Sequence, residues 1–233
     1  MKCKLLLFSA LLASASSIVA APISGTFQMN GIVTAFPTAF TWAAVSGSPN
    51  DVFSLSLGTG SFATENGTNA IHNLNNATEP VGVNFAPQDF IDFTVVAGMP
   101  SLNINFIPPG NGGLAGCSAP AAGTAPPQTC TVAGSPITFQ NNSVGGTVTG
   151  SSASWTFSGV TSDGLSRWNG VFTSQFVNQS YQQVLATFAS TGSVTASYSA
   201  NITVTALPEP GTALLGGTGL LFAFLSFRRR KRA

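Results

Sequence analysis

The chain has almost no basic side chains between its two ends. Between Pro22 and Leu207 the only Lys or Arg is Arg167, and this one base against six acids gives a net charge of −5, although the whole chain is at +1. Proteins that bind nucleic acid neutralise phosphates with clustered Lys and Arg. The body of this chain has no such cluster, which excludes nucleic-acid binding.

Catalytic and metal-binding side chains are also scarce. His72 is the only histidine, in an Asn-rich segment that we interpret as a solvated loop. A Ser-His-Asp triad would require it, and no Gly-x-Ser-x-Gly motif supplies a nucleophile. We therefore predict a non-enzymatic protein with no catalytic residues, no cofactor and no metal site.

One acidic pair leaves an alternative open. Asp89 and Asp92 are close in sequence, but side chains three apart on a regular strand point to opposite faces. We therefore do not expect them to converge on one sugar as the carboxylates of a glycosidase do. If their segment begins with a turn, the two carboxylates would instead help to bind Ca²⁺.

The charges that the body lacks are found at the ends. Lys2 and Lys4 precede an apolar run, Leu5 to Ala13, and small residues follow around Ala20. This order is typical of a secretory signal peptide. We predict that signal peptidase removes residues 1–20 and that residues 22–206 form the exported domain.

The C-terminal segment, residues 207–233, has three parts in order. Its extended motif consists of Pro208, Glu209, Pro210 and Gly211, and its apolar run spans residues 212–227. Sixteen helical residues span about 24 Å, which is slightly less than a bilayer core of ~30 Å. The basic stop that follows, which the positive-inside rule places in the cytoplasm, consists of Arg228, Arg229, Arg230, Lys231 and Arg232. We predict a transmembrane helix over residues 212–227.

These three parts together resemble the PEP-CTERM sorting signal of Gram-negative bacteria. The resemblance covers about residues 207–232 and implies recognition by an exosortase-type membrane transpeptidase. It also implies export, transient tethering in the inner membrane, cleavage near residues 208–210, and release or attachment at the cell surface. Proteins of this class are often associated with extracellular polysaccharide and biofilm material.

The two cysteines left after signal removal are Cys117 and Cys130. In an exported chain, such a pair is typical of a disulfide bond. They lie in a Pro- and Gly-rich excursion, residues 107–136, for which a disulfide predicts some order.

The exported domain has the alternating pattern of β-strands. Its best example runs from Val194 to Val204, where apolar and polar residues alternate. Gly145-Gly146 and Asp163-Gly164 are turn signals, as is Asn169-Gly170, while Asn30-Gly31 fits a turn or a bulge. We predict one all-β domain, a single antiparallel β-sandwich of jelly-roll type.

One short helix is expected after Ser180, where Gln183 completes a capping box and Gly192 provides the stop. Its apolar face should cover an open end or a face of the sheet.

Two functions from different classes agree with this sequence. The first is a non-enzymatic surface or extracellular-matrix protein, sorted through its C-terminal segment. The alternative is a carbohydrate-binding module or weak glycan-active enzyme built on the same sandwich. Trp168 is the candidate sugar contact, because the adjacent Arg167 and Asn169-Gly170 suggest an exposed position.

Overall fold

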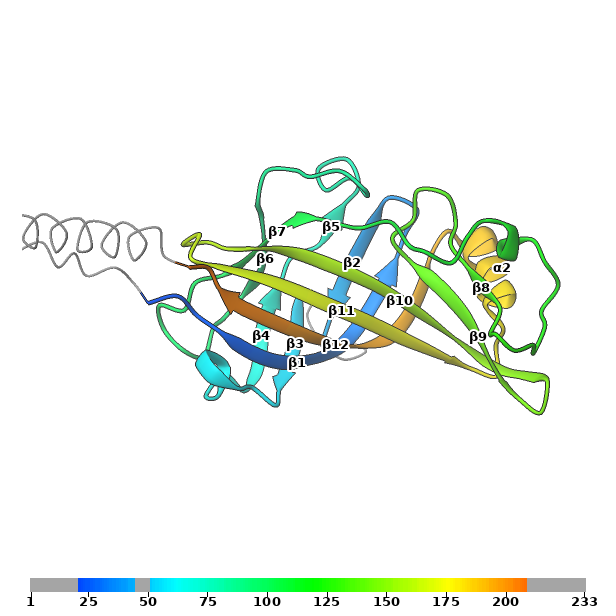
Figure 1. Cartoon of the computed structure of the whole chain (residues 1–233), viewed down its shortest axis with the longest axis horizontal. Helices are drawn as coiled ribbons and strands as arrows, with labels where there is room; N and C mark the ends of the chain where they lie inside the picture. Colours follow the sequence, from blue (N-terminus) through cyan, green and yellow to red (C-terminus); the bar gives the residue numbers. More distant parts are fainter. Residues whose placement is uncertain (1–20, 45–50, 209–233) are drawn as a thin grey trace, which may run out of the picture.

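The computed structural model describes residues 21–44 and 51–208, which form strands joined by loops and one α-helix (Figure 1). The helix, α2, spans Tyr181–Thr191, and the two 3-10 turns are η1 (Gly60–Phe62) and η2 (Ala115–Cys117). The strands are β1 (Gly25–Ala35), β2 (Ala39–Ala43), β3 (Val52–Ser56), β4 (Gly67–Ile71), β5 (Leu74–Asn75), β6 (Gln88–Asp92), β7 (Leu102–Phe106), β8 (Thr129–Cys130), β9 (Thr138–Val144), β10 (Thr147–Thr161), β11 (Ser166–Val177) and β12 (Val194–Ala206).

The signal peptide and the transmembrane segment predicted from the sequence lie outside the residues that the structure describes. The signal peptide, residues 1–20, and the expected transmembrane run, residues 212–227, are not among the described residues. Within the described ranges, no helix combines the length and the apolar character needed to span a bilayer.

All twelve strands belong to one sheet with antiparallel neighbours, and this sheet closes on itself. Closure occurs at β10, which pairs with β11 along residues 150–160 and with β7 along residues 158–161. We call the closed circuit β10-β11-β12-β1-β3-β4-β6-β7 the ring. The antiparallel all-β class with one helix is thus confirmed, but the strands form one closed sheet where the prediction had two facing sheets.

The alternation that predicted the strands reflects an inner and an outer face of the ring. Along β12, Tyr198, Ala200, Ile202 and Val204 are buried, while the residues between them are exposed. A two-residue period gives one buried face in a sandwich and in a closed sheet alike. It therefore could not distinguish the two architectures.

Two long strands change partners along their length, which opens one end of the ring. β1 pairs with β3 through residues 28–30 and with β2 through residues 32–35. β10 similarly pairs with β7 near its end and with β9 through residues 147–154. The pairs β2–β5 and β9–β8 diverge from the ring, and we call them the arms.

The turns predicted from the sequence are confirmed in part. Gly145-Gly146 forms the tight connection between β9 and β10, and Gly164 lies in the turn between β10 and β11. The turn expected at Asn169-Gly170 was wrong, because this dipeptide lies inside β11. Asn30-Gly31, expected as a turn or a bulge, lies inside β1 and pairs with β12 in continuous register. Gly31 is needed there for packing: a Cβ at this position would lie 2.5 Å from the Ala43 carbonyl oxygen and 3.0 Å from the Tyr198 ring.

Candidate functional site

An apolar cavity of about 300 Å³ lies between the two arms, with α2 as one of its walls. Its lining comes from both arms, from β10, β11 and β12, from the loop of residues 132–137 and from the helix. Aliphatic and aromatic side chains dominate this lining, among them Val33, Phe40, Leu74, Phe139, Val184 and Phe188. Ligand pockets in proteins are typically of ~300–1,000 Å³ and mostly apolar, and the cavity is at the lower end of that range.

Few polar side chains reach the cavity. Ser174 and Trp155 line it from β11 and β10, and both are buried, with 2% and 4% of their surface exposed. Their Oγ and Nε1 atoms have no hydrogen-bond partner within the described residues. Glu79 is the only charged residue of the lining, and its Oε2 accepts a hydrogen bond from the Asn75 amide at 2.7 Å.

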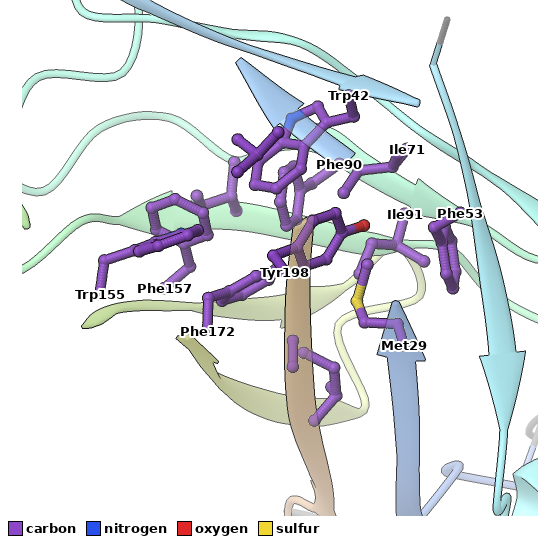
Figure 2. Close-up of a cluster of buried hydrophobic side chains, with 14 of the residues drawn as sticks. Met29, Trp42, Phe53, Ile71, Phe90, Ile91, Trp155, Phe157, Phe172 and Tyr198 are labelled. Atoms are coloured by element: carbon purple, nitrogen blue, oxygen red, sulfur yellow. The ribbon is translucent and has the colours of Figure 1, made fainter. Parts of the chain in front are cut away.

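The aromatic core of the ring lies next to the cavity. Trp155 stacks on Phe40 and on Phe172, with ring centroids 6.1 and 5.8 Å apart. Figure 2 shows the rings of Trp155, Phe157 and Phe172 grouped together, with Tyr198 close to them. Burial raises the pKa of the Tyr198 phenol well above its ordinary value. This rigid cluster fixes the orientation of the Trp155 indole beside the cavity.

The helix that forms one wall is fixed at its first turn. The predicted capping box is present: Ser180 and Gln183 exchange side-chain and backbone hydrogen bonds, and Gly192 ends the helix in a left-handed conformation. Asn141 of β9 is 2% exposed, and its Oδ1 accepts a hydrogen bond from the Tyr181 amide at 2.9 Å. Its Nδ2 donates to Gln128 and Gln182 side-chain oxygens at 2.8 and 3.1 Å. The helix therefore covers the open end of the ring, as predicted, in a defined position (Figure 1).

The Pro- and Gly-rich excursion is ordered by contacts to this same helix. Cys117 and Cys130 form a disulfide, which confirms the prediction. Beside it, the Tyr181 hydroxyl donates to the Gly116 carbonyl at 2.7 Å, and Gln182 Nε2 donates to the Ala119 carbonyl at 3.1 Å. The excursion thus holds α2 from the outside, and its last residues, 132–136, line the cavity together with Ile137.

The predicted sugar contact is corrected by the structure. Trp168 is 2% exposed, stacks on Phe90 at 5.7 Å and donates its indole N–H to the Asn103 carbonyl at 2.9 Å. Because Trp168 is on the inner face of β11, its ring has no face free for a sugar. Trp42 and Trp155 are buried as well, so the described residues present no exposed tryptophan platform.

The expectation that Asp89 and Asp92 point apart was also wrong. The register between β6 and β7 shifts between Asp89 and Ile91, as in a β-bulge, and Phe90 and Ile91 are both fully buried. The extra residue returns Asp92 to the side of Asp89. His72 joins them: its Nε2 lies 2.9 Å from Asp92 Oδ2 and 3.7 Å from Asp89 Oδ2.

The sequence suggested that His72 is an isolated residue of a solvated loop, whereas the structure places it in a cluster with two carboxylates at the surface. One potential ligand atom from each of the three residues lies within 4.8 Å of the others, the arrangement of a potential cation site. Its members are half-exposed, with 37–51% of each side chain accessible. A surface contact with this much solvent exposure contributes about 0–1 kcal/mol to stability.

The residues of the sorting motif are only partly described. Leu207 is hydrogen-bonded to the Leu165 carbonyl at 2.8 Å and Pro208 follows, whereas Glu209, Pro210, Gly211 and the basic residues 228–232 lie outside the described ranges. Residues 21 and 208 leave the ring at the same end, opposite to α2 (Figure 1). The cavity is therefore at the far end of the domain from the point where the C-terminal segment begins.

The cavity was missed from the sequence, because its lining comes from segments that are distant along the chain. One signal was nevertheless present: Ala153 and Ala196 are small residues at inward positions, each two residues from a bulky inward aromatic, Trp155 or Tyr198. Small inward side chains leave space, and both residues line the cavity.

Comparisons with known proteins yield no match to this chain, either among protein-family models or among curated proteins and solved structures.

Proposed function

We propose that this protein is an exported, non-enzymatic binding protein that holds an apolar small molecule in the cavity and is kept at the cell surface by its C-terminal segment. The observation that carries the binding proposal is the cavity of about 300 Å³ with a predominantly apolar lining at the open end of a closed sheet. Burying apolar ligand surface there is favourable by roughly 25 cal/mol per Å².

The chemistry of the lining favours binding over catalysis. Ser174 is the cavity's buried hydroxyl, and the lining contains no histidine or lysine that would activate it as a nucleophile. Glu79 has no second carboxylate beside it in the lining, and a glycosidase requires a pair. The burial of the three tryptophans speaks against the carbohydrate-binding alternative, because it removes the predicted sugar contact, Trp168.

The path of the chain supports a surface location for such a binding site. If residues 212–227 anchor the protein in the inner membrane, the domain is attached at the end opposite to α2, so the cavity faces away from the bilayer. An exosortase-type peptidase would then act on the extended motif at residues 208–211, after signal peptidase has removed residues 1–20. Association with extracellular polysaccharide is a part of this proposal that rests on the PEP-CTERM resemblance.

Filling the cavity should weaken ligand binding. Ala196 lies on the inner face of β12 and lines the cavity. Ala196→Phe should reduce affinity for butylbenzene, an uncharged probe of ten carbons, by about 10- to 100-fold, because the new ring occupies the ligand's space. Isothermal titration calorimetry of the full chain in lipid nanodiscs measures the change, with empty nanodiscs as the blank.

The matched control for this experiment is Ser197→Phe. Ser197 is the next residue of β12 and is exposed on the outer face, so the same ring is added without entering the cavity. Wild type and Ser197→Phe should bind the probe alike. If wild type does not bind butylbenzene, or if Ala196→Phe binds it as tightly as wild type does, the cavity is not a binding site.

Sorting is tested separately, at the C-terminus. In the native host, mass spectrometry of the extracellular fraction should find a mature end near residues 208–211, with the basic stop removed. Replacing Glu209 by alanine should leave the tail intact and the protein in the membrane fraction, whereas Thr205→Ala, an exposed change in β12, should be processed normally. Wild-type protein ending at Ala233 in every fraction would overturn the sorting proposal and leave the binding proposal untouched.

A further inference from the structure

His72, Asp89 and Asp92 form a surface cluster separate from the apolar cavity, and we call it the His-Asp cluster. None of the three residues lines the cavity, so an inference drawn from them does not depend on the proposed binding function. One nitrogen or oxygen atom from each residue lies within 4.8 Å of the others. Because 37–51% of each side chain is exposed, ions in solution can reach the cluster.

The backbone holds the three side chains of the His-Asp cluster close together. Asp89 and Asp92 both belong to β6, which is paired with β7 on one side and with β4 on the other. His72 directly follows β4, and its amide donates a hydrogen bond to the Phe90 carbonyl at 2.8 Å. Sites built on strands hold their geometry more precisely than sites built on loops. Two members of the cluster are thus on a paired strand, and the third is hydrogen-bonded to that strand.

The distances within the cluster match those between the ligands of a small transition-metal ion. Tetrahedral Zn²⁺ with bond lengths of about 2.0–2.1 Å has its ligand atoms about 3.3 Å apart. His72 Nε2 lies 2.9 Å from Asp92 Oδ2 and 3.7 Å from Asp89 Oδ2, one distance on each side of that value. Rotations of these half-exposed side chains would bring the three atoms to a common ion.

The charges of the cluster favour a divalent cation. Within the described residues, neither carboxylate has an ion pair with Lys or Arg, and Arg167, the only such residue there, is on β11. Two neighbouring carboxylates repel each other, and one histidine carries at most one positive charge. A divalent ion held by two carboxylates and a neutral imidazole would give a site without net charge.

The histidine determines the class of cation. Ca²⁺ and Mg²⁺ prefer oxygen ligands, whereas imidazole is a ligand of Zn²⁺ and other first-row transition metals. The Ca²⁺ alternative from the sequence used the two carboxylates alone, and the structure adds a nitrogen to them. We propose that His72, Asp89 and Asp92 bind a divalent transition-metal ion such as Zn²⁺. The imidazole binds through Nε2 with its proton on Nδ1, and water completes the coordination.

Zinc titration of the wild type and of three cluster variants tests this site. The full chain, without an affinity tag and freed of metal, is titrated with Zn²⁺ in nanodiscs of zwitterionic lipid, with empty nanodiscs as the blank. His72→Gln, Asp89→Asn and Asp92→Asn should each weaken Zn²⁺ binding by at least about 10-fold, because loss of even a group that supports a ligand costs that much. All three substitutions are at exposed or half-exposed positions, so the variants should unfold in urea as the wild type does.

Asp163→Asn is the matched control for the aspartate variants. Asp163 is an exposed carboxylate in the turn between β10 and β11 and is not a member of the cluster. The substitution removes one negative charge, and the asparagine oxygen can still accept the hydrogen bond from the Leu165 amide. Its affinity for Zn²⁺ should stay within about 2-fold of wild type, because salt screens the effect of a distant charge.

His72 also allows the metal to be located directly. It is the only histidine of the chain, so isotope labelling of histidine gives a single imidazole signal in an NMR spectrum. Zn²⁺ should shift this signal in the wild type and in Asp163→Asn, and the shift should require a higher Zn²⁺ concentration in Asp92→Asn. Ca²⁺ should bind at least about 10-fold more weakly than Zn²⁺, because the imidazole nitrogen is a poor ligand for it.

Each contrary outcome is distinct. A wild type that does not bind Zn²⁺, a His72→Gln variant that binds it as tightly as the wild type, or an imidazole signal that Zn²⁺ does not shift would overturn the site. Binding of Ca²⁺ as tight as that of Zn²⁺ would overturn the transition-metal class. Butylbenzene binding is measured separately at the cavity, so the zinc site and the proposed function can fail independently.

Discussion

Replacing Gly159 by alanine should destabilise the protein by about 3 kcal/mol or more, the upper end of the usual cost of overpacking. Gly159 lies where β10 begins to pair with β7, the contact that closes the ring. A Cβ there would overlap the Asn103 carbonyl and would lie 2.7 Å from Trp168 Nε1. The same carbonyl accepts the Trp168 indole hydrogen bond, so it cannot move away without breaking that bond. Urea unfolding, followed by tryptophan fluorescence, gives the change in unfolding free energy.

Gly164→Ala provides the comparison for this prediction. Gly164 is in the turn between β10 and β11 with φ of +71°, and no heavy atom would lie within 4 Å of an added Cβ. Its substitution should therefore cost only the left-handed backbone penalty, about 1–2 kcal/mol. If Gly159→Ala costs no more than Gly164→Ala, then β10 and β7 do not approach as closely as the closed sheet requires.

Local features of this fold could be predicted from the sequence because nearby residues determine them. The capping box at Ser180 and Gln183 and the stop at Gly192 fix α2 through contacts within a few residues. The alternation in β12 likewise depends only on which face of a strand is buried. The cysteine pair was predicted from composition and context, with only two candidates left to bond.

Ring closure and the cavity depend on contacts that no local pattern encodes. β10 pairs with β7, β9 and β11, and the choice of these partners decides between a closed sheet and a sandwich. Trp168 was assigned to the surface because Arg167 and Asn169-Gly170 surround it, but on a strand the neighbours of a buried residue are exposed. The sequence context that suggested exposure is thus the expected context of an inward side chain.

The bulge in β6 shows how one extra residue reverses a prediction. Strict alternation placed Asp89 and Asp92 on opposite faces, and the shift between Asp89 and Ile91 places both beside His72. The apolar pair Phe90-Ile91 interrupts the alternation and was the available signal. Reading that interruption as a bulge would have brought the two carboxylates together.

Asn141→Ala should lower the unfolding free energy by about 2–4 kcal/mol and weaken butylbenzene binding. Alanine removes three hydrogen bonds: the one accepted from the Tyr181 amide and the two donated to Gln128 and Gln182. A buried donor left without its acceptor, here the Tyr181 amide, adds a desolvation cost to each lost bond. Because α2 is a wall of the cavity, loosening its first turn should also reduce affinity, by about 3- to 10-fold. Urea unfolding and calorimetry measure the two effects on the same samples.

Asn142→Ala is the control for this prediction, because it removes an amide side chain from β9 without removing a contact to α2. Asn142 also lies on β9, and its Nδ2 donates to Gln175 Oε1 at an exposed position with a separation of 3.3 Å. Asn142→Ala should change stability by less than about 0.5 kcal/mol and leave binding unchanged. Should Asn141→Ala reduce stability with wild-type affinity for the probe, the cavity would not depend on α2, and its ligand would have to be held by the ring and the arms alone. If stability and affinity both fall, Asn141 holds α2 in the position that the cavity requires for binding.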